Sequence, residues 1–171
     1  MPDHTRDHPH TDDPPGECRM LEIKRERAFG RTYRILSDGA PVARWSAHAW
    51  KSGGRVEVAG ETFELRSGKW GRSFEMLAGD TVRAEAHRSG RRWVVTGEGA
   101  EYELTRQSLR GNRRLVQGTR VLGEFRRSGF GTGLTAELTD VPLSLQIFTG
   151  LVAVSLQHRQ NTAAAASASS G

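Results

Sequence analysis

The sequence has a single cysteine, Cys18, among its 171 residues. One thiol excludes an internal disulfide and any metal cluster held by cysteines. The first 17 residues contain no apolar segment, so a signal peptide is not expected there. The protein is therefore expected to fold without covalent cross-links and to be cytoplasmic.

Apolar residues are also scarce, at 36% of the chain, with a mean hydropathy of −0.58. One long run, Val141 to Gln157, nevertheless carries no charge. At about 100° per residue, its apolar side chains cover nearly all sides of an α-helix. Such a helix is buried, either inside a protein or in a bilayer. We predict a helix over 141–158 and expect it to be the core on which a sheet closes.

Lysine is rare, because only Lys24, Lys51 and Lys69 are lysines among 25 basic residues. Residues 1–17 hold five acidic side chains and one arginine, a net charge of −4, so the remaining 24 basic and 15 acidic residues carry +9. Positive charge of this kind favours acidic or polyanionic partners. A biased genome composition would produce the same arginine excess.

The two ends of the chain have compositions typical of disorder. Residues 1–17 are rich in Asp, His and Pro, and residues 161–171 are of low complexity. The three histidines of the first segment are interpreted as part of a solvated tail and not as a metal site. The predicted folded domain is therefore 18–160.

Between the tails, apolar residues alternate with polar ones in short runs bounded by Gly, Ser and Asp, which is typical of strands with one wet face. No helical period occurs before residue 141. The predicted strands are residues 19–24, 31–36, 41–47, 54–59, 62–66, 72–77, 81–87, 92–96, 101–105, 113–117, 120–127 and 133–138.

The strands repeat with a period of about 40 residues. An apolar-Glu-apolar strand occurs at Glu22, Glu64 and Glu103, and a glycine follows each glutamate after seven or eight positions. The pattern indicates three units of four strands. In the third unit the helix begins where the fourth strand should be, and residues 19–24 supply that strand from the other end of the chain.

A β-propeller is one architecture for such repeats, but propellers need at least about four blades and have no place for an apolar helix. Twelve antiparallel strands closed as a barrel leave a lumen too wide for side chains alone, since about eight strands is the number that side chains fill. A buried helix would occupy that space. The predicted fold is all-β, a closed antiparallel barrel of twelve strands around a C-terminal hydrophobic helix.

Three four-stranded units followed by an apolar helix resemble the tubby C-terminal-like superfamily, which includes the LURP-one-related proteins and the phospholipid scramblases. The resemblance covers residues 19–158, rests on architecture, and is strongest for the short LURP-one-related members. It implies a non-enzymatic binding or scaffold domain, with acidic lipid headgroups at a membrane surface as the ligand. The sequence departs from the pattern, because tubby's phosphoinositide-binding basic residues, the acylated cysteine-rich segment of scramblases and an acidic calcium loop have no counterpart.

Arginine clusters fall at predicted hairpin ends, where guanidinium groups could pair bidentately with the phosphates of a polyanion. The alternative interpretation is that charges at hairpin ends are simply solvated. The candidate ligand-binding residues are Arg88, Arg91, Arg92, Arg110, Arg113, Arg114, Arg126 and Arg127.

Four tryptophans, Trp45, Trp50, Trp70 and Trp93, could stack with the bases of single-stranded nucleic acid, but packing in the barrel or at its rim is the preferred interpretation. No catalytic constellation, cofactor motif or metal site stands out. The sequence thus predicts a non-enzymatic domain that binds acidic headgroups, cytoplasmic or peripheral to a membrane. The alternatives are an arginine-driven nucleic-acid binding protein and a membrane-anchored domain that uses residues 142–158.

Overall fold

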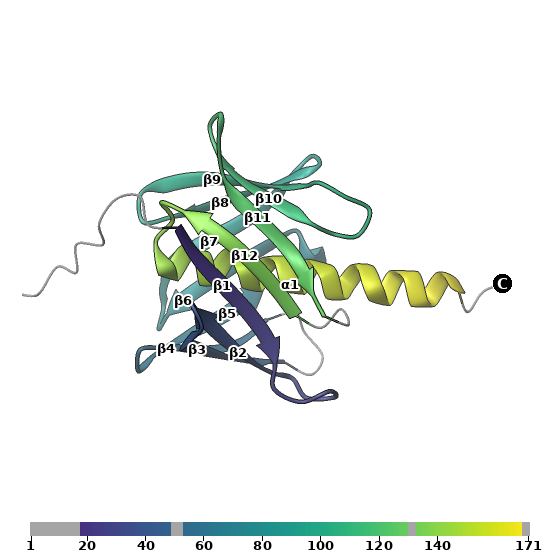
Figure 1. Ribbon diagram of the computed structural model, residues 1–171, viewed down its shortest axis with the longest axis horizontal. Coiled ribbons are helices and arrows are strands. Elements are labelled where there is room, and N and C mark those ends of the chain that lie inside the picture. Colours follow the sequence, from purple (N-terminus) through teal and green to yellow (C-terminus); the bar gives the residue numbers. More distant parts are fainter. Residues whose placement is uncertain (1–17, 49–52, 130–132, 169–171) are drawn as a thin grey trace, which may run out of the picture.

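The computed structural model describes residues 18–48, 53–129 and 133–168. Twelve antiparallel strands form a closed barrel in which each strand pairs with the next in the chain and β1 pairs with β12 (Figure 1). The strands are β1 (Cys18–Arg25), β2 (Thr32–Ser37), β3 (Ala40–Ala47), β4 (Gly53–Val58), β5 (Glu61–Ser67), β6 (Ser73–Ala78), β7 (Thr81–Ser89), β8 (Arg92–Gly97), β9 (Ala100–Arg106), β10 (Arg113–Gln117), β11 (Arg120–Ser128) and β12 (Gly133–Thr139). The predicted fold is confirmed, while the predicted tail 1–17 lies outside the described residues.

The three-unit repeat reappears as three matching irregularities of the sheet. In β2, β6 and β10 the register against the following strand shifts once, which marks a β-bulge. The residue after each shift pairs on its other side with one of the repeated glutamates: Leu36 with Glu22, Leu77 with Glu64, and Val116 with Glu103. A bulge bends its strand and increases the local twist. Three bulges, each four strands from the next, therefore help to curve the sheet until it closes.

The chain leaves the sheet where the third unit would make its last hairpin. The β4–β5 and β8–β9 turns begin with Ala59 and Glu98 in the left-handed region, at φ values of 49° and 51°. Asp140 follows β12 with a φ of 58°, but the helix comes next. The strand that the turn would lead to is β1, whose Cys18 pairs with Thr139. The predicted closure by residues 19–24 is therefore confirmed.

Helix α1 (Leu143–Ala168) runs through the lumen of the barrel (Figure 1). Every residue from Leu145 to Gln157 is buried, and the side chains of Ile147, Phe148 and Leu151 are 0% exposed. These side chains meet the inward-facing residues of the strands in a single core. The described residues include no helix that is long and apolar enough to cross a bilayer. Residues 142–158, the alternative membrane anchor, thus supply the core of the barrel.

The helix continues to Ala168, ten residues beyond the predicted end at His158, and so includes residues 161–168 of the predicted tail. The extension is exposed from Asn161 onward and projects from the barrel (Figure 1). Alanine has the highest helix propensity, and residues added to an existing helix carry no nucleation cost. No burial is needed for this segment to be helical, and a search for apolar periodicity cannot detect it.

The two ends of the barrel carry opposite charge. The helix enters at the entry end, formed by the turns at 38–39, 59–60, 79–80, 98–99, 118–119 and 140–142, and leaves at the mouth, whose described loops include 26–31, 68–72, 90–91 and 107–112. The entry-end turns carry four acidic residues and no basic one. These mouth loops carry Lys69, one glutamate and five arginines, which are Arg27, Arg31, Arg72, Arg91 and Arg110. The mouth is therefore the end to which an anion is attracted.

Candidate anion-binding site

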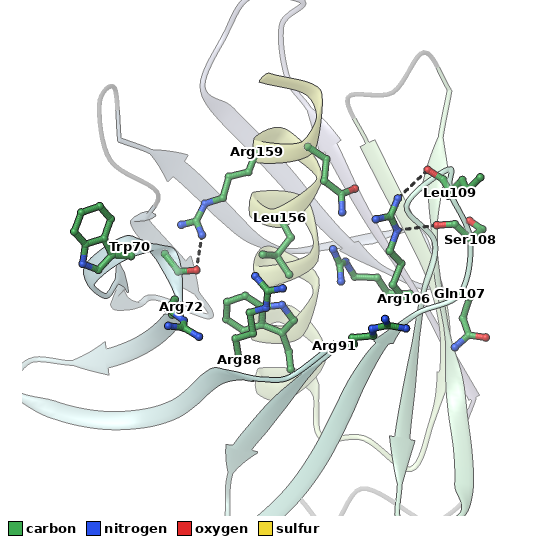
Figure 2. A pocket seen from close by; sticks show the side chains of 14 residues that line it. Trp70, Arg72, Arg88, Arg91, Arg106, Gln107, Ser108, Leu109, Leu156 and Arg159 are labelled. Atoms are coloured by element: carbon green, nitrogen blue, oxygen red, sulfur yellow. Dashed lines mark hydrogen bonds between the residues drawn. The ribbon is translucent and has the colours of Figure 1, made fainter. Parts of the chain in front are cut away.

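A cavity of about 740 Å³ lies at the mouth, between the last buried turn of α1 and the rim formed by β6 to β10 (Figure 2). Six arginines line it: Arg72, Arg88, Arg91, Arg106, Arg113 and Arg159. Apolar surface comes from Trp70, Trp93, Leu109 and Leu156. No acidic side chain is among the described residues that line the cavity. The cavity therefore has the composition of a site for an anion.

Five of the six arginines converge because each extends the inward-facing series of its own strand. Residues two apart in a strand point to the same face of the sheet. In β9, Leu104 is buried and Arg106 is two positions further toward the mouth; in β10, Arg113 stands in the same relation to buried Leu115. Arg72, Arg88 and Arg91 stand two positions from buried Phe74, Ala86 and Trp93. An arginine thus lies at the mouth end of five neighbouring strands, within β7, β9 and β10 and just before the first residue of β6 and β8.

Arg113 is the most unusual of these arginines, because its side chain is buried. The residue is 6% exposed, and its Nε donates to no acceptor among the described residues. Burial, and next the charge of Arg106, lower the pKa of Arg113 to about 10. An unpaired charge in a desolvated position costs several kcal/mol. A bound anion would supply the missing partner and offset that cost.

Three further arginines are held in place by neutral acceptors. Arg159 donates from Nη1 to the Gly71 carbonyl at 2.6 Å, and its guanidinium lies 4.9 Å from the centroid of the Phe74 ring. Arg106 donates to the carbonyls of Ser108 and Leu109 (Figure 2), and Arg88 donates to that of Gly90. Carbonyl oxygens fix a guanidinium group without neutralising its charge. Arg88 and Arg106 are therefore ordered and still positively charged.

The structure divides the eight predicted ligand-binding residues into two groups. Arg88, Arg91 and Arg113 line the cavity, whereas Arg92, Arg110, Arg114, Arg126 and Arg127 do not. Arg92 pairs with Glu103 at 2.7 Å, and Arg126 lies 3.6 Å from Glu124. Arg114 and Arg126 line a separate outer groove that also contains Glu124 and Glu137. Arg91, in the turn before β8, lines the cavity, whereas its neighbour Arg92, in β8, does not, so clustering in sequence did not define a single site.

Sequence reasoning missed Arg72, Arg106 and Arg159. The signal for the first two was present, because Arg106 continues the alternation of Tyr102 and Leu104, and Arg72 continues that of Phe74 and Met76. Grouping the arginines by strand face would have found both of them. Arg159 follows the buried part of α1 and reaches the cavity only because the helix exits there.

The tryptophans fall into two classes. Trp45 and Trp93 are 2% and 6% exposed, as the preferred interpretation expected. Trp70 is 94% exposed, so the expectation that it packs in the barrel or at its rim was wrong. Its backbone lies in the left-handed region at a φ of 59°, within the short 3-10 helix Lys69–Gly71. Trp50 lies outside the described residues.

A second polar cluster joins α1 to the rim, on the side of β1 and β2. The hydroxyl of Tyr33 lies 3.1 Å from Nε2 of His158 and accepts hydrogen bonds from Nε and Nη2 of Arg25, at 3.2 and 2.9 Å. Because the hydroxyl oxygen accepts from Arg25, its hydrogen is free to be donated to a neutral His158. Burial, and next the charge of Arg25, lower the pKa of His158. The folded protein therefore favours the uncharged imidazole.

This cluster predicts a loss of stability in mild acid. His158 in the unfolded chain titrates near its ordinary pKa of about 6.5, so below that pH the unfolded state binds a proton that the folded state resists. The free energy of unfolding should fall as the pH decreases from about 6.5 to the lowered folded pKa, and this contribution is fully present above 6.5. Denaturant titrations at several pH values in this window measure how the free energy of unfolding depends on pH. In His158→Gln the free energy of unfolding should change less with pH than in the unchanged protein. A pH dependence equal to that of the unchanged protein would contradict the assignment.

The fold thus defines a twelve-stranded antiparallel barrel threaded by one helix, with a basic cavity at the mouth. No protein-family model matches the chain, and no curated protein matches it. Among solved structures it is similar to the X-ray structure of a protein from Arabidopsis thaliana, AT5G01750, with 13% sequence identity and a TM-score of 0.37. That similarity covers 82% of this chain and 91% of the other.

Proposed function

We propose that this protein is a non-enzymatic binding domain that holds a phosphate-bearing anion in the mouth cavity, with the acidic headgroup of a phospholipid at a membrane surface as the first candidate. The observation that carries the proposal is Arg113, which is buried, whose Nε has no partner among the described residues, and which lies in a cavity lined by arginines and by no described acidic side chain. Membership of the tubby C-terminal-like superfamily, on the twelve-stranded architecture, is part of the same proposal.

A phosphate-bearing ligand suits this cavity better than a simple anion. Guanidinium groups form bidentate, charge-assisted hydrogen bonds with phosphate oxygens, and several phosphates or a phosphate with a carboxylate would engage more than one arginine. The charge difference between the mouth and the entry end supports the same ligand class. It would orient the protein with its mouth toward an anionic surface before contact. From this proposal it follows that the protein is cytoplasmic and peripheral to a membrane.

Single-stranded nucleic acid is the second candidate, and the exposure of Trp70 at the edge of the cavity favours it. Exposed aromatic rings beside arginines are the usual components of base-stacking sites. Such binding would weaken steeply as salt increases, because phosphate contacts release counterions. Arginine-driven binding of nucleic acid is therefore tested together with vesicle binding in the experiment below.

The test is a charge reversal inside the cavity. Arg88→Glu/Arg91→Glu should weaken binding to vesicles of phosphatidylcholine with phosphatidylserine by more than about tenfold, since each basic side chain near such a surface contributes about 1 kcal/mol. Vesicle flotation measures the binding, and a gel shift with single-stranded RNA tests the second candidate. The control Arg34→Glu/Arg114→Glu makes the same change of net charge outside the cavity. If control and cavity variants weaken binding equally, the cavity is not the site.

A further inference from the structure

Three large apolar side chains are wholly exposed in the described part of the chain: Phe29, Trp70 and Leu109, at 101%, 94% and 94%. The next most exposed large apolar residue is Val121, at 55%. The three side chains lie on the β1–β2, β5–β6 and β9–β10 loops, which are equivalent loops of the three repeats at the mouth. A side chain that contacts nothing in the folded protein gains no stability from packing. Three such side chains at equivalent places therefore need an explanation outside the barrel.

The three loops have similar internal hydrogen bonds, although Phe29 and Trp70 directly precede the bonded glycine and Leu109 precedes it by two positions. In each loop a glycine N–H donates to a carbonyl three residues earlier: Gly30 to Arg27, Gly71 to Gly68, and Gly111 to Ser108. In each, a second backbone bond closes the base of the loop: Glu26 to Thr32, Gly68 to Ser73, and Gln107 to Asn112. The exposed side chains thus belong to turns that backbone hydrogen bonds hold in a defined conformation.

Trp70 and Leu109 differ from Phe29 because they flank the arginine cavity. Both line it, from opposite sides, with arginines between them (Figure 2). Arginines of the cavity also hold the two loops: Arg159 donates to the carbonyl of Gly71, and Arg106 to that of Leu109. The groups that would bind an anion therefore fix the position of the two apolar side chains. Phe29 lies on the remaining equivalent loop, beyond the part of the rim from β6 to β10 that the cavity occupies.

Two apolar side chains on either side of a basic cavity complement an anionic bilayer surface. Tryptophan is favoured at the level of the headgroups, and leucine is favoured at the boundary with the acyl chains. Arginine between them meets the negative surface potential and the phosphates. A nucleic acid would account for Trp70 by base stacking, but the leucine has no aromatic face to stack on. The pair Trp70 and Leu109 thus favours a membrane.

We propose that Trp70 and Leu109 insert into the headgroup region of an anionic bilayer, on the two sides of a headgroup that the arginine cavity holds. The docking surface is the part of the mouth over β6 to β10, and the protein engages the bilayer at a tilt. The tilt follows from the projecting end of α1, which prevents a flat surface from meeting all three loops together (Figure 1). This inference rests on the proposed function and adds the surface and the orientation.

The experiment separates insertion from headgroup binding by measuring both for the full chain. The vesicle contains phosphatidylcholine with phosphatidylserine, and the soluble probe is glycerophosphoserine, which lacks acyl chains. Trp70→Ala/Leu109→Ala should weaken vesicle binding by at least about tenfold, and by much more than it weakens the affinity for glycerophosphoserine, because both side chains also line the cavity. Phe29→Ala, the matched control on the equivalent loop, should change neither. Trp70→Phe should retain vesicle binding but lose much of the blue shift of tryptophan emission that insertion produces.

Each result decides one of the two proposals. If Trp70→Ala/Leu109→Ala binds vesicles as well as the unchanged protein, while Arg88→Glu/Arg91→Glu does not bind them, the docking surface is wrong and the proposed function stands. If Phe29→Ala weakens vesicle binding as much as the double variant, the tilted orientation is wrong. If Arg88→Glu/Arg91→Glu changes neither affinity, the proposed function itself fails. Binding to single-stranded RNA that depends on Trp70 but not on Leu109, without vesicle binding, would replace the membrane by nucleic acid.

Discussion

Replacing Leu151 with aspartate should abolish folding. The side chain is 0% exposed at the centre of the buried part of α1, surrounded by inward-facing residues of the barrel. The variant loses the burial of a leucine, which contributes about 1.5–3 kcal/mol, and places a carboxylate where an unpaired charge costs several kcal/mol more. A domain has about 5–15 kcal/mol of net stability. Far-UV circular dichroism and a thermal melt should show no cooperative transition.

The control for this variant lies on the same helix. Ala164→Asp introduces the same side chain on the exposed, projecting part of α1 and should melt like the unchanged protein. A truncation after Thr139 removes the helix altogether and should aggregate, because twelve strands would then enclose an unfilled lumen. A soluble truncation with a cooperative melt would show that the barrel does not need its helix.

Arg113→Met should weaken ligand binding and stabilise the protein at the same time. Methionine fills a similar space without a charge, so the variant removes a buried guanidinium group, whose Nε has no partner among the described residues, and its repulsion by Arg106. Removing an unsatisfied buried polar group should raise the free energy of unfolding by about 1–3 kcal/mol. Urea titration measures the stability, and vesicle flotation measures the binding.

Arg114→Met is the matched control, since it makes the same substitution at the next residue of β10. Arg114 faces the outer groove and not the cavity. Its replacement should leave both the stability and the binding nearly unchanged. A loss of stability in Arg113→Met would mean that the guanidinium already has a favourable partner in the unliganded protein, which would remove the main support for an anion site.

The sheet could be predicted because each strand has one solvent-exposed face and one buried face. Alternation such as Phe63, Glu64, Leu65 marks a strand directly, and each predicted strand lies within two residues of the observed boundaries. The repeated glutamates then gave the number of units, and the apolar run from Val141 identified what fills the lumen. A strand or helix with a buried face has apolar residues at regular intervals in the sequence. The strands and the buried part of the helix could therefore be predicted.

Features that do not depend on burial were missed. The extension of α1 beyond His158 is exposed, and its helical state comes from alanine propensity and from continuity with the buried helix. Trp70 differs from Trp93 because it stands outside any alternating run, between β5 and β6, whereas Trp93 alternates with Val95. The cavity joins five neighbouring strands with the helix. Arginines that are close together in the sequence form a cluster there, but the cluster does not show which of them lie on the same face of the sheet.

The order of the elements along the chain affects how the protein must be made. Helix α1 follows all twelve strands, and β1 pairs with β12, more than a hundred residues later. At about 5–20 residues per second, β1 waits roughly 6–25 seconds on the ribosome before its second neighbour and the helix exist. During that time the hairpins can form, but the sheet exposes its apolar face and two open edges. We therefore expect synthesis of this protein to depend on chaperones that cover nascent apolar surface, and refolding in vitro to be limited by closure around the helix and by competing aggregation.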